Sequence, residues 1–201
     1  GAIASAQSGA GAATTLFPAI GSGGAVFLRL GLAAVVFGCV VRPRPRSFTK
    51  ADLRAAVAFG IVMGGMNAAF YASLARIPLG VAVTIEFLGP LGVAVAGSRR
   101  WLDAVWVVLA ALGVVLLTSG GGHLSATGVS FAAVAAACWA AYILLSQRVG
   151  RAVPGMSGLA VAMIVAAVLA APYGIAAGGA ALVRPGVLGK GAAVAFLSSV
   201  V

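Results

Sequence analysis

Eight long apolar runs constrain this chain more than any other feature of its sequence. A helix needs about 20 consecutive apolar residues to cross the hydrocarbon core of a bilayer, and the complete runs have that length. Buried strands of a soluble protein would be much shorter. The runs cover residues 1–20, 23–41, 55–75, 79–98, 101–119, 126–147 and 156–180, and a last one from about Lys190 to Val201.

The scarcity of charge excludes a soluble fold. Only 8% of the 201 residues are charged and 62% are hydrophobic, whereas an ordinary globular domain carries about 25% charged residues. Backbone groups in lipid must be satisfied within their own segment, which favours helices. Short segments of alternating polarity, typical of a membrane β-barrel, are not seen. We therefore predict an all-α, polytopic transmembrane helical bundle.

Basic residues are concentrated in alternate gaps between the runs, which indicates the orientation. The formal net charge is +10, but these residues form no basic stripe with interleaved aromatics, which argues against nucleic acid as a partner. The positive-inside rule makes the more basic side cytoplasmic, and we expect a bacterial plasma (inner) membrane. Its nine basic residues are Arg42, Arg44, Arg46, Lys50, Arg54, Arg99, Arg100, Arg148 and Arg151.

Two glycine-rich stretches are predicted to mark turns on the outer side, at residues 21–24 and 120–123. The second divides the chain into residues 1–119, with five predicted helices, and residues 120–201, with the sixth to eighth. Because five crossings is an odd number, the second part restarts from the opposite face. That is the geometry of an inverted repeat.

Glu86 is the acidic residue that lies deep inside an apolar run. A carboxylate at the bilayer centre costs about 2.5–3.5 kcal/mol on insertion scales. Four residues later Pro90 lacks an N–H, so the Glu86 carbonyl loses its helical partner and a kink is expected. Broken helices line central sites in transporters, and burial favours the protonated carboxyl, which suggests proton coupling. The alternative is a structural glutamate that bonds to a neighbouring helix.

Two further sets of polar and aromatic residues share helical faces. Asn67 and Tyr71 are four residues apart, and Trp139, Tyr142 and Ser146 follow at spacings of three and four. They could line a polar cavity in which aromatic rings face an ammonium group, or they could serve only packing and interhelical hydrogen bonds. Weaker candidates are Gln7, Ser8 and Arg29, the last of which could instead extend to the membrane interface.

Other chemistry finds little support in the sequence. Cys39 and Cys138 are separate and apolar in context, no Cys/His cluster suggests a metal, and we expect no cofactor. Residues 155–158 read Gly-Met-Ser-Gly, as in rhomboid-type proteases, but the one histidine, His123, is predicted on the opposite side of the membrane from Ser157. No phosphate-binding glycine loop occurs. The chain is therefore not expected to be an enzyme.

Several runs together carry a family resemblance. Residues 64–71 (GGMNAAFY), 77–91 (IPLGVAVTIEFLGPL) and 98–113 (SRRWLDAVWVVLAALG) resemble EamA-type transporters of the drug/metabolite transporter superfamily, and most of all the threonine/homoserine exporter group. Residues 16–18, 28–30 and 137–144 continue the likeness. The resemblance implies about ten helices in two inverted five-helix repeats, of which the second would be truncated here. It also implies amino-acid export by proton exchange.

Taken together, these observations predict a secondary transporter, an antiporter that exports a small amino acid or related metabolite. Glu86 would bind the substrate ammonium and a proton competitively, and Asn67, Tyr71, Trp139 and Tyr142 would shape the pocket. The partners would be the substrate, protons and the lipid bilayer. The alternative is a passive channel, which should show a continuous polar stripe, or a non-transporting membrane scaffold. Because the sequence begins and ends inside apolar runs, we also expect a fragment.

Overall fold

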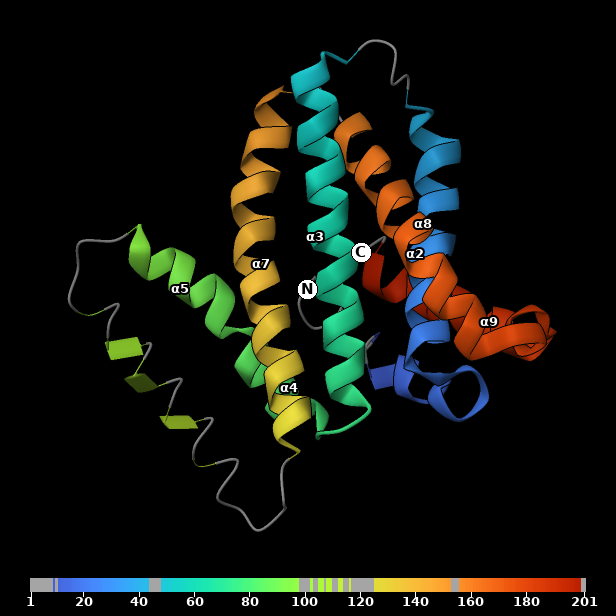
Figure 1. The fold of residues 1–201 in the computed structure, drawn as a ribbon, viewed down its shortest axis with the longest axis horizontal. Helices are drawn as coiled ribbons and strands as arrows, with labels where there is room; N and C mark the ends of the chain where they lie inside the picture. The colour runs from blue at the N-terminus through green and yellow to red at the C-terminus, as the bar shows by residue number, and fades with distance from the viewer. Residues whose placement is uncertain are drawn as a thin grey trace. The chain divides into compact units, whose positions relative to one another are not determined.

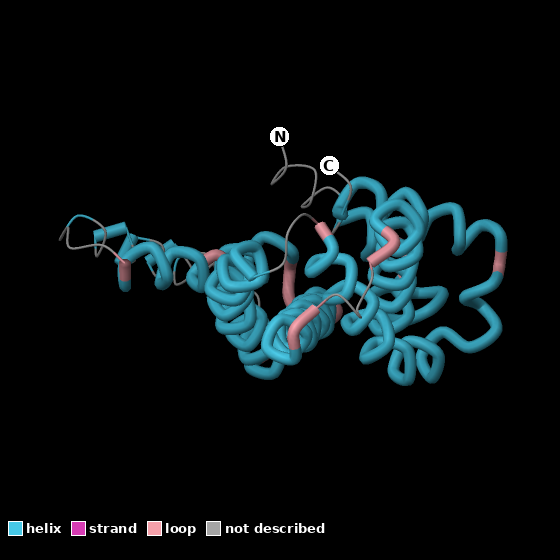
Figure 2. Tube along the Cα trace, turned by 90° about the horizontal axis from the view of Figure 1, so that it is seen from above, coloured by secondary structure: helices cyan, strands magenta, loops and turns pink. Residues whose placement is uncertain are grey.

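The computed structural model describes most of the chain as helices joined by short loops (Figures 1 and 2). The described residues are 9, 11–43, 48–97, 102, 105–106, 108–109, 112–113, 116, 125–152 and 156–199. Within them there is no strand, and the all-α prediction is confirmed. The helices are α2 (Phe17–Val41), α3 (Lys50–Leu74), α4 (Leu79–Glu86), α5 (Leu88–Ala96), α7 (Ala126–Ala152), α8 (Ser157–Gly178), the 3-10 turn η2 (Gly179–Val183) and α9 (Pro185–Ser199).

Five segments among the described residues are long and apolar enough to cross a membrane. Only 22% to 50% of the most apolar stretch of each is buried inside the protein, and large apolar side chains such as Val40, Leu144 and Val168 are exposed. Lipid has to solvate such surfaces, which confirms a polytopic membrane protein. Residues 1–8 and 10 of the predicted run 1–20 fall outside the described residues, and so does most of the predicted run 101–119. The five segments are Phe17–Val41, Lys50–Leu74, Leu79–Ala96, Ala126–Arg151 and Ser157–Val183.

Helix α3 begins before the apolar run that predicted it. The Thr49 hydroxyl accepts a hydrogen bond from the Asp52 amide (3.2 Å), and the Asp52 carboxylate accepts one from the Thr49 amide (3.0 Å). This reciprocal capping box satisfies two amides that a helix start leaves without partners. The helix therefore starts at Lys50 rather than near Ala55, and its first turn is polar.

The predicted outer turn at residues 21–24 is wrong in extent. Only Gly21 departs from helical dihedrals, with φ 66° and ψ 174°, and it kinks α2. A positive φ of this kind suits glycine, which has no Cβ. Gly23 lies in the helix, where a Cβ would come within 2.6 Å of the Tyr173 ring of α8. The absence of a side chain at Gly23 thus allows α2 to pack closely against α8. The second predicted turn, residues 120–123, lies outside the described residues.

The contacts within the chain divide it into two compact units. The first consists of residues 1–64 and 145–201, and the second of residues 65–144. In the first unit the predicted GxxxG pair packs α3 on α8. A Cβ on Gly60 would lie 2.5 Å from the Ala162 carbonyl oxygen, and one on Gly64 would lie 3.3 Å from the Ala166 Cα. This grouping by contacts is not a test of the repeat boundary predicted after residue 119, which stays a prediction.

The second unit holds all five predicted site residues. A Cβ on Gly65 of α3 would lie 3.9 Å from the Cys138 sulfur of α7, and one on Gly128 of α7 would overlap Ile77. At Gly89 of α5 a Cβ would overlap the backbone of Ala136 on α7. Helices α3 and α5 therefore both pack directly on α7, at positions where small residues permit it.

Gly89 and Gly92 form a matched pair, one turn apart on α5. We predict that Gly89→Ala destabilises the protein by about 1–3 kcal/mol, the usual range for overpacking, because the new methyl group meets the Ala136 backbone. Nothing lies within 4 Å of a Cβ at Gly92, so Gly92→Ala should be neutral, or stabilising by up to about 1 kcal/mol through helix propensity. Thermal unfolding in detergent compares the two, and equal melting temperatures would contradict the close approach.

Candidate functional site

The membrane-crossing segment 79–96 is broken at a single residue, Phe87. Helix α4 ends at Glu86 and α5 begins at Leu88, and Figure 1 shows the change of direction between them. Pro90 has no N–H to give to the Glu86 carbonyl. The Phe87 amide donates to the Val83 carbonyl (3.0 Å), and the Phe87 carbonyl accepts from the Leu91 amide (3.1 Å). The break predicted from Glu86 and Pro90 is thus present, and it is confined to one residue.

Glu86 is buried at this break, with 6% of its surface exposed. Among the described residues, the other buried polar side chains are Asn67 (4%) and Ser73 (0%). The Ser73 hydroxyl donates to the Phe70 carbonyl at 2.7 Å, one turn back on its own helix. Ser73 is therefore satisfied within its own helix. Glu86 is an ionisable group in an apolar interior, which marks a candidate functional site in a membrane protein.

Helix α3 presents its two predicted residues to the interior. Asn67 and Tyr71 are buried, Tyr71 completely. The Phe70 ring lies edge-on to the Tyr71 ring, with centroids 6.2 Å apart. Both predicted residues thus share a buried face of α3, as their spacing indicated.

Helix α7 places its predicted residues along one face. The residues of this face follow one another at spacings of three and four. The first three are buried and small, Gly128, Ala132 and Ala135, and the next three are Trp139, Tyr142 and Ser146. Trp139 and Tyr142 are half-buried. The face begins with glycine and alanine, and Trp139 follows where α7 passes the break.

The structure adds one residue that the sequence analysis missed. The Phe87 ring packs edge-to-face on the Trp139 indole, with centroids 5.1 Å apart and planes at 62°. Such a pair contributes about 0.5–1.5 kcal/mol beyond the area it buries. It joins the break in α4–α5 to the predicted aromatic wall on α7. The adjacency of Phe87 to Glu86 was visible in the sequence, but its partner across helices was not.

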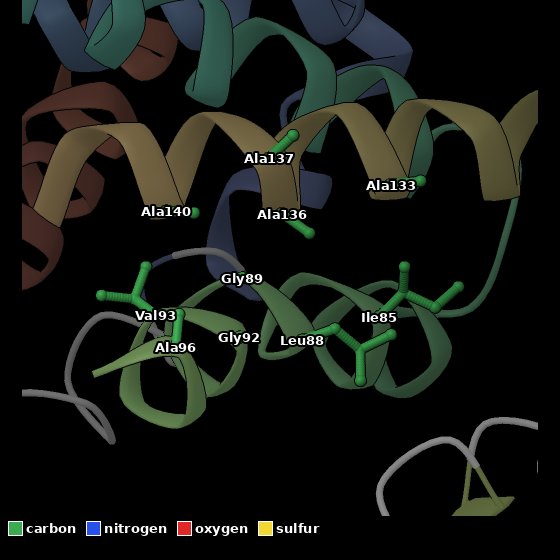
Figure 3. Close-up of a pocket in the computed structure, with 10 residues that line it drawn as sticks. All are labelled: Ile85, Leu88, Gly89, Gly92, Val93, Ala96, Ala133, Ala136, Ala137 and Ala140. Carbon is green, nitrogen blue, oxygen red and sulfur yellow. The ribbon is translucent and has the colours of Figure 1, made fainter. Parts of the chain in front are cut away.

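An open groove of about 430 Å³ runs along α7 and the α4–α5 segment (Figure 3). Its lining is apolar, and none of the five predicted site residues belongs to it. It offers no side chain that could orient a charged amino acid, so we do not assign it as the substrate site. Its lining residues are Ile85, Leu88, Gly89, Gly92, Val93, Ala96, Ala133, Ala136, Ala137 and Ala140.

The remaining candidates lie elsewhere. Arg29 is half-buried on α2, in the other compact unit. Gln7, Ser8 and His123 fall outside the described residues. Arg76 was not predicted as a site residue. It lies just after α3 and donates to the Ala72 carbonyl (2.6 Å), and its guanidinium lies 5.0 Å from the centre of the Phe131 ring.

The long apolar helices define a polytopic membrane protein, and the buried carboxyl group at the helix break marks its candidate site. The chain is 42% identical over 201 residues to the threonine/homoserine exporter RhtA of Salmonella typhimurium (strain LT2) and to that of Escherichia coli (strain K12). The match covers 98% of this chain and 68% of each relative. The chain belongs to the family of these RhtA exporters.

These relatives are named as exporters and not as enzymes. The predicted location, a multi-pass protein of the bacterial inner membrane, is confirmed by this relationship and by the membrane-spanning helices. No family model and no solved structure matched the chain.

The break at Phe87 gives a structural prediction. Spin labels on Gly80→Cys and Gly97→Cys, both exposed positions, with Cys39 and Cys138 changed to Ala, should be closer than the about 26 Å of an unbroken helix of that length. Pro90→Ala restores the amide that the Glu86 carbonyl lacks, so the distance should lengthen toward that value. Pro78→Ala, at the cap of α4, is the control and should change nothing. An unchanged distance in Pro90→Ala would mean that packing, not the missing amide, sets the break.

Proposed function

We propose that this protein is a secondary transporter that exports threonine, homoserine or similar small amino acids from the cytoplasm in exchange for protons. The kinship with the RhtA exporters supports the class of substrate. The observation that carries the site is the burial of Glu86, 6% exposed, at the one-residue break between α4 and α5.

Competition at one carboxyl group would couple the two fluxes. A negative charge is costly in an apolar interior, so the carboxyl group of Glu86 would favour binding a proton or a cationic group. The ammonium group of an amino acid is such a cation, and its arrival displaces the proton. Glu86 would therefore hold a proton when the site is empty and release it when substrate binds, which is the exchange an antiporter requires.

The other residues would orient the substrate around Glu86. The Asn67 amide can both donate and accept hydrogen bonds, which suits a substrate hydroxyl or carboxylate. Tyr71 adds a phenol on the same face of α3. The rings of Trp139 and Tyr142 offer negative faces to the ammonium group. Each of these groups is buried or half-buried within the same compact unit.

A carrier fits the site better than a channel or a scaffold. Within the described part of the chain the buried polar side chains are few, namely Asn67, Ser73 and Glu86, and they form no continuous stripe along a helix, whereas a channel is expected to have one. We further propose that the site is assembled by two inverted repeats, residues 1–119 and the part of the second repeat in residues 120–201. On this proposal the protein moves its substrate chemically unchanged and is not an enzyme.

Glu86→Gln in the complete gene product tests the coupling. Glutamine keeps the volume and loses the charge, so threonine efflux from cells should fall about ten- to hundredfold, the equivalent of one hydrogen bond to a charged group. The residual efflux should no longer depend on external pH. Glu86→Asp, which keeps the charge, is the matched control and should retain pH dependence. Wild-type efflux with unchanged pH dependence in Glu86→Gln would refute the coupling role.

Counterflow in proteoliposomes separates a carrier from a channel. Unlabelled threonine on one side should accelerate uptake of labelled threonine from the other, because a carrier returns faster when loaded. Uptake that is indifferent to substrate on the far side would contradict the carrier and favour a passive channel.

A further inference from the structure

The aromatic pair at the helix break carries a further inference. Phe87 is the single residue between α4 and α5, and its backbone bonds to both helices, through Val83 on one side and Leu91 on the other. Its dihedral angles, φ −65° and ψ −17°, are helical. The direction of the Phe87 side chain is therefore fixed by two helices at once.

Trp139 has little to hold it on its own helix. Side chains on a helix lean toward the preceding turn, which for Trp139 consists of Ala135 and Ala136. Two methyl groups cannot restrain an indole. Phe87 supplies the restraint from the facing helix, edge-on at 5.1 Å.

The backbones of the two helices come together beside this pair. Gly89, two residues beyond Phe87, lies so close to α7 that a Cβ would overlap the Ala136 backbone, and Figure 3 shows these two positions facing each other. Contact between backbones leaves α5 no room to approach further. The close approach of the two backbones at Gly89 thus holds α5 beside α7, where the Phe87 and Trp139 rings are in contact.

We propose that Phe87 is a positioning and specificity-determining residue: it fixes the Trp139 indole as a wall of the amino-acid site and so limits the size of the side chain that is exported. This inference rests on the proposed function of the site. Phe87 acts through Trp139 and has no part in the proton exchange assigned to Glu86.

Fluorescence of Trp139 tests the positioning without any transport. The protein has three tryptophans, so Trp101→Phe with Trp106→Phe leaves Trp139 as the one indole emitter. In this background Phe87→Leu should lower the steady-state anisotropy of Trp139, and Phe87→Tyr, which keeps the ring, should preserve it. Phe131→Leu removes a ring two turns earlier on α7 and is the matched control, with no change expected. Unchanged anisotropy in Phe87→Leu would overturn the positioning role.

Selectivity tests the second half of the inference. The ratio of efflux of a larger amino acid, such as methionine, to efflux of threonine should rise in Phe87→Leu by about two- to twelvefold, the equivalent of one aromatic pair. Phe87→Tyr and Phe131→Leu should keep the wild-type ratio. Because a ratio is measured, a lower amount of folded protein alone does not move it.

The outcomes separate the inference from the function on which it rests. Threonine efflux with the wild-type ratio in Phe87→Leu would overturn the specificity role and leave the exporter standing. Absence of threonine efflux by the unmutated protein would overturn the proposed function and this inference with it. A raised ratio together with lowered anisotropy supports both.

Discussion

A backbone carbonyl inside a membrane needs a hydrogen-bond donor, and Pro90 cannot supply one to Glu86. In water such a carbonyl would bond to solvent, but in lipid every backbone polar group depends on the protein. The helix therefore ends at Glu86 and restarts at Leu88. The carboxyl group and the carbonyl of one residue consequently lie together at the break, and the aromatic side chain of Phe87 points out of it toward α7.

Small residues make this arrangement possible. Lipid is as apolar as the helices themselves, so helices associate through close packing and polar contacts instead of the hydrophobic effect. Gly89 brings α5 to the backbone of α7, and Gly60 brings α3 to the Ala162 carbonyl of α8. Between such contacts only a few side chains can be large. On α7, Trp139 and Tyr142 follow a stretch of alanines.

The apolar runs and the Glu86–Pro90 pair were sufficient to predict the fold class and the helix break. Both features depend on local chemistry. The length of an apolar run decides whether a helix can cross the membrane, and the N–H that Pro90 lacks would have bonded to the carbonyl four residues earlier. The apolar run predicts too late a start for α3, because apolarity marks the part inside the membrane, whereas the helix itself extends to the capping box at Thr49 and Asp52. The sequence does not distinguish Gly23 from a turn residue, because the side chain it packs against, Tyr173, is distant in sequence.

The Phe87–Trp139 pair was not predictable for the same reason. Phenylalanine and tryptophan are both ordinary residues in an apolar helix, and nothing local distinguishes a ring that faces lipid from a ring that faces another helix. Asn67, Tyr71 and Tyr142 could be placed on faces by their spacing, and those faces are buried or half-buried. Their roles toward a substrate remain predictions.

The shortness of the two pieces on either side of Phe87 has a mechanical consequence. Helix α4 has eight residues and α5 has nine, so their lengths are about 12 and 13 Å at a rise of 1.5 Å per residue. A rotation of either helix by about 10° about Phe87 would then displace its far end by only about 2 Å. Motions of that size make or break a hydrogen bond without unpacking a helix from its neighbours. The same rotation at the end of a longer helix would cause a larger displacement and would disrupt the packing of the bundle.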